Sequence, residues 1–264
     1  MLLTIDVGNT NIEFGFYDGD TLLGSFRTMT KSNQTSDELG LSLCEYLEHF
    51  HWQPQDVEDV IIASVVPGIM YSLKNAMLKY LGKRPLVVNE DVFPTLGYLG
   101  GATTNEHGAD RSVACMAAVE KYGAPLLVLD FGTATTVDAV DAQGVYVGGS
   151  ICPGVRVSMD ALAQNAAMLP HVELSLPQTA LGYDTVAQIQ IGVVGGYVGS
   201  MEYLIRRTKA EMAEPDDQIK VIATGGLARM VADHTDAIDT VDSELILEGL
   251  VRIYRAYRDG RSGT

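Results

Sequence analysis

Basic residues are scarce in this sequence. Its 264 residues include 18 lysines and arginines against 34 aspartates and glutamates, so the formal net charge is −16. Proteins that bind nucleic acid or anionic membranes use a basic surplus to neutralise phosphates, and this chain has none. We therefore expect neither as a partner. A small phosphorylated ligand stays open, because it needs only a local site of turn amides and metal ions.

Cysteine and long apolar segments are also scarce. The three cysteines, Cys44, Cys115 and Cys152, have neither zinc-ligand nor C-x-x-C spacing. An odd number of scattered cysteines indicates free thiols in a reducing compartment. No basic segment followed by an apolar core opens the sequence, and no apolar run is long enough to span a membrane. We therefore expect a cytoplasmic protein of one or two domains.

Two related glycine turns are the most informative feature of the chain. Asp6-Val7-Gly8 follows the apolar run 2–5, and Asp130-Phe131-Gly132 follows the run 126–129. Both lead into another β-branched segment, so each is expected to be a strand–turn–strand unit with an aspartate at its entrance. Glycine lets the backbone approach a ligand, turn amides can hold phosphate oxygens, and the carboxylate can hold a cation. The pair suggests two similar half-molecules around one nucleotide.

The order of predicted elements supports two such halves. Three strands in hairpins are followed by alternating helices and strands, once from residue 2 and again from residue 126. Gly123-Ala124-Pro125 marks the expected boundary, which predicts one α/β domain at 1–122 and another at 123–264. Each is expected to be a mixed sheet with helices on its faces. The final helix, about 244–258, can pack back on the first domain, and 259–264 is expected to be a frayed tail.

Five stretches, in this order, resemble the type III pantothenate kinases. They are Asp6–Asn11, Gly108–Arg111, Asp130–Thr136, Gly148–Gly154 and Leu181–Thr185. A later turn, Thr224-Gly225-Gly226, fits the wider superfamily of acetate and sugar kinases, heat-shock chaperones and actin. The resemblance implies two ribonuclease-H-like (actin-like ATPase) halves with a cleft between them. It also implies ATP-dependent phosphorylation of pantothenate to 4′-phosphopantothenate, the first step of coenzyme A biosynthesis.

The resemblance further implies a role for individual residues. Asp110 would accept the proton of the pantothenate hydroxyl, a role that phosphoryl transfer to an alcohol requires. Asp130 would hold a monovalent cation, potassium or ammonium, and Asp6 would lie near magnesium. ATP would lie along Asp6, Val7, Gly8, Asn9, Thr10, Asn11, Ile12, Glu13, Gly132, Thr133, Gly225 and Gly226. Pantothenate would contact Gly108, Ala109, Asp110, Arg111 and Thr185. The implied assembly is a homodimer with pantothenate at or near the subunit boundary.

Several positions depart from the family pattern. Glu13 stands where many relatives have lysine, Ala114 where they often have asparagine, and Gly101 where they usually have tyrosine. Tyr183-Asp184-Thr185 replaces a commoner asparagine-rich version. Two other functions therefore stay open. One is a catalytically weakened relative that binds nucleotide and regulates a partner, and the other is a superfamily phosphatase acting on polyphosphate or guanosine polyphosphates.

The segment 182–212 is predicted to be one long, kinked helix. Its apolar residues exceed what one helix face needs, which suggests a buried partner surface and hence a dimer. They are Ile189, Ile191, Val193, Val194, Val198, Met201 and Leu204.

Overall fold

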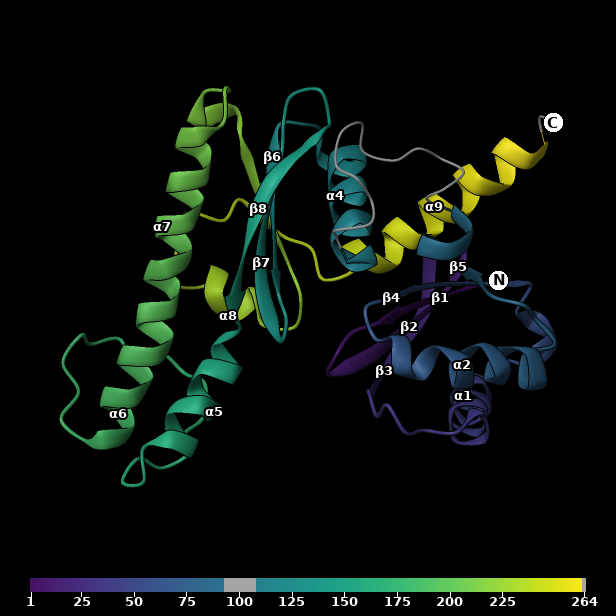
Figure 1. Ribbon diagram of the computed structural model, residues 1–264, viewed down its shortest axis with the longest axis horizontal. Helices are drawn as coiled ribbons and strands as arrows, with labels where there is room; N and C mark the ends of the chain where they lie inside the picture. Colours follow the sequence, from purple (N-terminus) through teal and green to yellow (C-terminus); the bar gives the residue numbers. More distant parts are fainter. Residues whose placement is uncertain (93–107, 263–264) are drawn as a thin grey trace. The chain divides into compact units, whose positions relative to one another are not determined.

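The computed structural model describes residues 1–92 and 108–262 (Figure 1). Contacts divide the chain into two compact units, which we call unit 1 (Met1–Ala117 with Glu244–Thr264) and unit 2 (Ala118–Ser243). The final helix therefore belongs to unit 1, and the predicted boundary after residue 122 stays a prediction. The glycine- and threonine-rich segment 97–105, with its departure at Gly101, and His107 lie outside the described residues.

Unit 1 is built on a five-stranded mixed sheet with the strand order β3-β2-β1-β4-β5. Strand β1 is antiparallel to β2 and parallel to β4, as expected for a hairpin followed by a crossover helix. The elements are β1 (Leu2–Val7), β2 (Asn11–Asp18), β3 (Thr21–Met29), α1 (Ser36–His49), η1 (Pro54–Asp56), β4 (Asp59–Ser64), α2 (Pro67–Ala76), η2 (Met77–Leu81), β5 (Leu86–Val87), η3 (Val88–Val92), α4 (Ala109–Tyr122) and α9 (Leu245–Ser262). The last turn of α4, from Ala118, already belongs to unit 2.

Helices cover both faces of this sheet. On one face, the alternate residues Leu3, Ile5 and Val7 of β1 are buried in a cluster with apolar residues of α1 and α2. On the other face, Ile61 and Ala63 of β4 are buried with residues of α4 and α9. Side chains alternate between the two faces of a strand, and here both faces are covered by helices. The central strands therefore carry apolar residues on each face.

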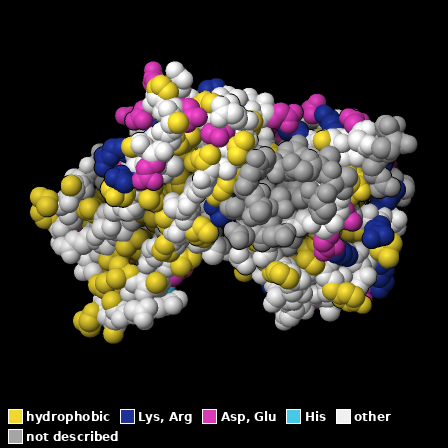
Figure 2. All heavy atoms as spheres, turned by 45° about the horizontal axis from the view of Figure 1, so that its top comes forward, with side chains coloured by type: hydrophobic (Ala, Val, Ile, Leu, Met, Phe, Trp, Pro, Cys, Tyr) yellow, Lys and Arg dark blue, Asp and Glu magenta, His cyan; other side chains and the backbone are white. Residues whose placement is uncertain are grey.

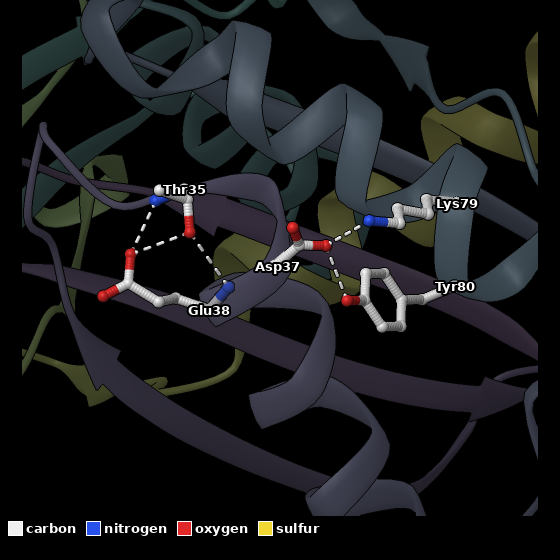
Figure 3. Close-up of polar contacts among 5 residues, drawn as sticks. All are labelled: Thr35, Asp37, Glu38, Lys79 and Tyr80. Atoms are coloured by element: carbon white, nitrogen blue, oxygen red, sulfur yellow. Dashed lines mark hydrogen bonds and ion pairs between the residues drawn. The ribbon is translucent and has the colours of Figure 1, made fainter.

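Helix α1 is fixed at its start by a capping box (Figure 3). Thr35 Oγ1 accepts a hydrogen bond from Glu38 N, and Glu38 Oε2 accepts one from Thr35 N. Tyr80 of η2 packs its ring where a Cβ on Gly40 would lie, and its hydroxyl donates to Asp37 Oδ1 at 2.7 Å. Glycine at position 40 therefore lets α1 and η2 approach closely.

Unit 2 repeats the same topology. Its five strands have the order β10-β9-β6-β7-β8, with β6 antiparallel to β7 and parallel to β9, so β6 corresponds to β1 and β9 to β4. The elements are β6 (Leu126–Phe131), β7 (Ala134–Val140), β8 (Tyr146–Pro153), α5 (Val155–Asn165), α6 (Thr185–Gln190), η4 (Ile191–Gly195), α7 (Gly196–Glu211), η5 (Asp216–Gln218), β9 (Lys220–Thr224), α8 (Ala228–Ala232) and β10 (Thr240–Val241).

The long helix predicted at 182–212 is divided. One π-helical turn, η4, separates α6 from α7, which is the kind of interruption that accommodates an irregular helix. Its apolar residues Ile189, Val194, Val198 and Met201 are buried in the core of unit 2 itself. They therefore do not indicate a partner surface. The frayed tail predicted from residue 259 is also wrong for the described part, because α9 continues to Ser262.

No helix in the described ranges is both long and apolar enough to cross a membrane. None of the three cysteines forms a disulfide within the described residues. Burial raises the pKa of the Cys44 and Cys152 thiols, which disfavours the thiolate form.

Candidate active site

The Gly8 turn forms an exposed loop at the carboxyl end of β1. Gly8 N donates to Asn11 O at 3.0 Å, which closes the turn. Thr30, just beyond β3, holds it from the next hairpin: its Oγ1 donates to Gly8 O at 2.7 Å, and its N donates to Thr10 O at 2.8 Å. Carboxyl ends of parallel strands are where open α/β sheets bind ligands, so the turn is well placed for an anion.

Three charged side chains lie side by side on neighbouring strands of the unit 1 sheet, close to the Gly8 turn. In the strand register, Asp6 of β1 is opposite Glu13 of β2, and Glu13 is opposite Arg27 of β3. Arg27 Nη2 donates to Glu13 Oε1 at 2.8 Å. That hydrogen bond raises the pKa of Arg27, and the negative charges of Glu13 and Asp6 raise it further. The acidic charge at position 13, unexpected beside phosphates, is thus paired with a cation.

Asp110 lies at the same end of the sheet. Ala109, the first residue of α4, is buried in the cluster that contains Ala63, and Ala63 is opposite Asp6 in the register. A Cβ on Gly108 would lie 3.0 Å from Val65 Cγ1 and would overlap Asp110 Oδ1. The Asp110 carboxylate therefore folds back over Gly108, where it also accepts from Arg111 N at 2.7 Å. Unit 1 thus brings the predicted phosphate turn and the predicted proton acceptor together.

The Gly132 turn is the counterpart in unit 2. Gly132 N donates to Ala134 O at 3.1 Å, and Gly132 and Thr133 are exposed. Gly154, which precedes α5, donates its N–H to Thr133 O at 3.0 Å, and a Cβ there would overlap Gly132 O. Gly154, the last residue of the Gly148–Gly154 stretch, therefore lets α5 start directly against the turn.

Asp130 lies beside the end of β9. It is opposite Thr136 of β7 and Thr224 of β9 in the register. Gly225, with φ +90°, follows β9, and a Cβ on it would overlap Asp130 Oδ1. The close approach of the turn after β9 to this carboxylate therefore requires glycine at residue 225. Unit 2 thus brings Asp130, the Gly132 turn and the Gly225-Gly226 turn to one edge of its sheet.

Tyr197 of α7 is a site residue that the sequence did not indicate. Its hydroxyl is hydrogen-bonded to Thr135 Oγ1, one strand residue beyond the Gly132 turn. Burial raises the pKa of Tyr197 to about 12, an effect that the hydrogen bond opposes and the nearby Cys152 and Asp130 reinforce. Tyr197 therefore stays protonated at neutral pH and fixes the start of β7. No sequence signal distinguishes it from an ordinary core tyrosine.

Thr185 lies in an apolar pocket of unit 2. It is the first residue of α6, after Asp184, whose Oδ1 accepts from Ala187 N at 2.9 Å. Aspartate and asparagine are equally good at this capping position, which explains why the departure at residue 184 keeps the helix start. The pocket has a volume of about 440 Å³ and is lined by Leu162, Leu169, Thr185, Gln188, Ile189, Gly192 and Val193.

Clusters of acidic, histidine or cysteine side chains do not define a metal site here. Among the described residues, no three of them are grouped so that they could hold a metal ion. A cation at Asp6 or Asp130 would therefore take its remaining ligands from backbone carbonyls, hydroxyls, water or substrate phosphates, as hard cations do.

Comparison with known proteins gives a family match over most of the chain. The family model described as type III pantothenate kinase matches residues 2–207. A type III pantothenate kinase of Agathobacter rectalis is 45% identical over 257 residues, which cover 97% of each chain.

Solved structures match over nearly the whole chain at low sequence identity. A protein assigned to the Baf family of transcriptional activators from Campylobacter jejuni has a TM-score of 0.61 at 20% identity and covers 97% of this chain and 99% of its own. The activator of the 2-hydroxyisocaproyl-CoA dehydratase from Clostridium difficile, with bound ADPNP, has a TM-score of 0.56 at 13% identity over 99% and 96%. These similarities confirm the predicted fold class, two ribonuclease-H-like halves of the actin-like ATPase type.

Proposed function

This chain belongs to the type III pantothenate kinase family, and on that premise we propose that its two glycine turns hold the phosphates of ATP. The enzyme phosphorylates pantothenate with ATP in coenzyme A biosynthesis. One observation carries the nucleotide site: the equivalent strands β1 and β6 both end in exposed glycine turns. The proposed ATP contacts are Asp6, Val7, Gly8, Asn9, Thr10, Asn11, Ile12 and Glu13 in unit 1, and Gly132, Thr133, Gly225 and Gly226 in unit 2.

Asp110 is the proposed proton acceptor. The pantothenate hydroxyl oxygen attacks the γ-phosphorus, the bond to the bridging oxygen of ADP breaks, and the hydroxyl proton passes to the Asp110 carboxylate. Its position in the first turn of α4 favours the ionised form that can accept this proton. Arg111 offers forked donors for a carboxylate or phosphate oxygen of the substrate. Gly108, Ala109 and Thr185 complete the proposed pantothenate contacts.

Two cations fit the residues present. Asp6 provides a hard oxygen ligand beside the Gly8 turn, which suits magnesium bound to ATP phosphates. Asp130 provides another such ligand beside the Gly132 turn, which suits a monovalent cation. When bound, these ions neutralise negative charge on the transferring phosphoryl group.

A monovalent cation at Asp130 should make the reaction dependent on salt identity. We expect pantothenate-dependent ADP release to rise steeply when sodium chloride is replaced by potassium or ammonium chloride at fixed ionic strength and magnesium. Equal rates in the three salts would remove this role from Asp130. The parallel reaction without pantothenate is the control, because release there would indicate hydrolysis rather than transfer to the vitamin.

Assembly as a homodimer is also proposed, and exposed apolar side chains of unit 2 support it. Figure 2 shows hydrophobic side chains on the surface of this unit. Tyr183 is 94% exposed, and Met168, Leu181 and Val186 are exposed as well. They adjoin Thr185 and Leu169 of the pocket in the sequence, so a second copy on them would lie at the proposed pantothenate contact.

Light scattering at micromolar concentration should therefore give twice the chain mass of 28.4 kDa. Tyr183→Asp should shift the mass toward that of one chain. Tyr71→Asp is the matched control, because Tyr71 is 80% exposed in unit 1 and should leave the dimer intact. A monomer mass for the unmodified protein would contradict the proposal.

The proposed location is the cytoplasm. The free thiols of Cys44, Cys115 and Cys152 suit a reducing compartment.

A further inference from the structure

We propose that Arg27 binds the terminal phosphates of ATP and that Glu13 positions it for this contact, an inference that rests on the proposed phosphate site at the Gly8 turn. Arg27 is on β3, two strands away from Asp6 and outside every motif that the sequence resemblance contains. Its connection to the site comes from strand register and from its ion pair.

The register places Arg27 on the face of the sheet that carries Asp6. Asp6, Glu13 and Arg27 are directly opposite one another on three adjacent strands, so their side chains point to the same face. Ala63 continues the row on β4, and Ala109, next to the proposed proton acceptor Asp110, is buried in the same cluster as Ala63. Neighbouring strands are about 4.8 Å apart, so the row is short enough for one triphosphate to lie along it.

Helix α9 covers part of this face of the sheet, and the charged row lies just outside the covered part. Thr4 and Gly15 form the preceding pair on the same face, and a Cβ on Gly15 would lie 3.1 Å from Leu247 Cδ1 of α9. One pair further toward the Gly8 turn, Glu13 is 25% exposed and Arg27 is 47% exposed. The helix thus seals the sheet up to Gly15 and leaves the charged row accessible to a ligand.

The ion pair leaves Arg27 able to bind a phosphate. A single nitrogen, Nη2, donates to Glu13 Oε1 at 2.8 Å. A guanidinium carries five N–H donors in a planar fork, so donors remain for the two oxygens of a phosphate. The Glu13 carboxylate restricts the fork to one orientation, which lowers the entropy lost when a phosphate binds.

Charge balance requires a cation at this point. Asp6 and Glu13 place two carboxylates on the row beside the Gly8 turn, and ATP adds several further negative charges. Arg27 is the basic side chain that the register places on this row. Without it, like charges at the mouth of the turn would oppose nucleotide binding.

Steady-state kinetics can separate this role from a purely structural ion pair. Arg27→Gln is expected to raise KM for ATP roughly tenfold to a hundredfold, the usual loss for a hydrogen bond to a charged group. KM for pantothenate should stay unchanged. Arg27→Lys should recover part of the ATP affinity, because it keeps the charge but loses the fork. Glu13→Gln should raise KM for ATP by less than Arg27→Gln, because only the positioning is lost.

Arg207→Gln is the matched control. Arg207 on α7 pairs with Glu211 at 2.9 Å, so this variant loses the same charge and one exposed ion pair in unit 2. It should keep the KM of the unmodified enzyme.

Two results would overturn the inference or its premise. A lower melting temperature with an unchanged KM for ATP in Arg27→Gln would make the Glu13–Arg27 pair structural only. If that variant does not fold, an unchanged KM for ATP in Arg27→Met, which also removes the charge, would lead to the same conclusion. Asp6→Asn tests the premise separately: if it raises KM for ATP while Arg27→Gln does not, only the inference fails. If neither variant changes it, the phosphates do not bind at the Gly8 turn.

Discussion

Asp110→Asn is expected to lower kcat by roughly 10² to 10⁴, the usual contribution of general-base assistance. Asparagine keeps the shape of the side chain and can still accept from Arg111 N, as Asp110 Oδ1 does at 2.7 Å. It cannot take a proton from the pantothenate hydroxyl at neutral pH. KM for ATP and the melting temperature should therefore stay close to those of the unmodified enzyme, and the loss should appear in kcat and in kcat/KM for pantothenate alike.

Asp37→Asn is the control for removing an aspartate from the first turn of a helix. Asp37 occupies that turn of α1 in the same unit, where it is exposed and paired with Lys79 (Figure 3). Its substitution should leave kcat unchanged. Normal turnover in Asp110→Asn would assign Asp110 to the surface, and a parallel loss of melting temperature and activity would make its role structural. Either outcome would remove Asp110 as the proton acceptor.

Gly225→Ala is expected to lower the free energy of unfolding by about 2–5 kcal/mol, because backbone strain at a positive φ and overpacking by the new Cβ both destabilise the folded state. Gly225 has φ +90°, a region that alanine adopts only at a cost. Its new Cβ would lie 2.7 Å from Phe131 N and would overlap Asp130 Oδ1. Backbone cannot move aside as a flexible side chain can, so we also expect the dependence on potassium to be weakened as Asp130 is displaced.

Urea unfolding of the two units can be followed with different probes. The single tryptophan, Trp52, lies in unit 1, whereas far-UV circular dichroism reports on both units. Gly199→Ala is the matched control in unit 2, because nothing lies within 4 Å of its Cβ position in α7. It should be neutral or stabilising by about 0.5–1 kcal/mol. An unfolding transition of Gly225→Ala that coincides with that of the unmodified protein would contradict the expected clash.

The sequence predicted the local structure around the two glycine turns well, because a glycine between two apolar, β-branched runs is typical of a turn between strands. The turns at Gly8 and Gly132, with strands on both sides, are confirmed. The run Thr35-Ser36-Asp37-Glu38 contains three residues that can cap a helix, and the structure shows that Thr35 caps α1, in a capping box with Glu38.

The pairing of Glu13 with Arg27 could not be predicted from the hairpin alone. If the strands paired without interruption from Asp18 and Thr21 onward, Glu13 would be opposite Phe26. Arg27 would then point to the other face of the sheet from Glu13. A register shift between Phe16 and Tyr17 moves the pairing by one residue and brings Arg27 opposite Glu13. A bulge of this kind has no reliable sequence signature, yet it changes the face of every residue beyond it.

The apolar residues of 182–212 were misinterpreted for a different reason. Periodicity shows how many helix faces are apolar but not what covers them. In the structure, the core of unit 2 buries Val194, Val198 and Met201, whereas Tyr183, Val186 and Tyr203 of this segment are exposed.

Helix α9 packs on unit 1 although it follows unit 2 in the sequence, and this order affects folding during protein synthesis. Leu247 and Val251 are buried against Tyr17, and Leu250 and Ile253 against Ile61, so the second face of the first sheet is completed by residues that are synthesised after all of unit 2. Unit 2 is continuous in the sequence and can fold as soon as residue 243 has emerged. The N-terminal half, although made first, must wait with that apolar face uncovered. Unit 1 is therefore the later of the two units to finish folding, and a nascent chain released before Leu245 would leave this apolar face uncovered.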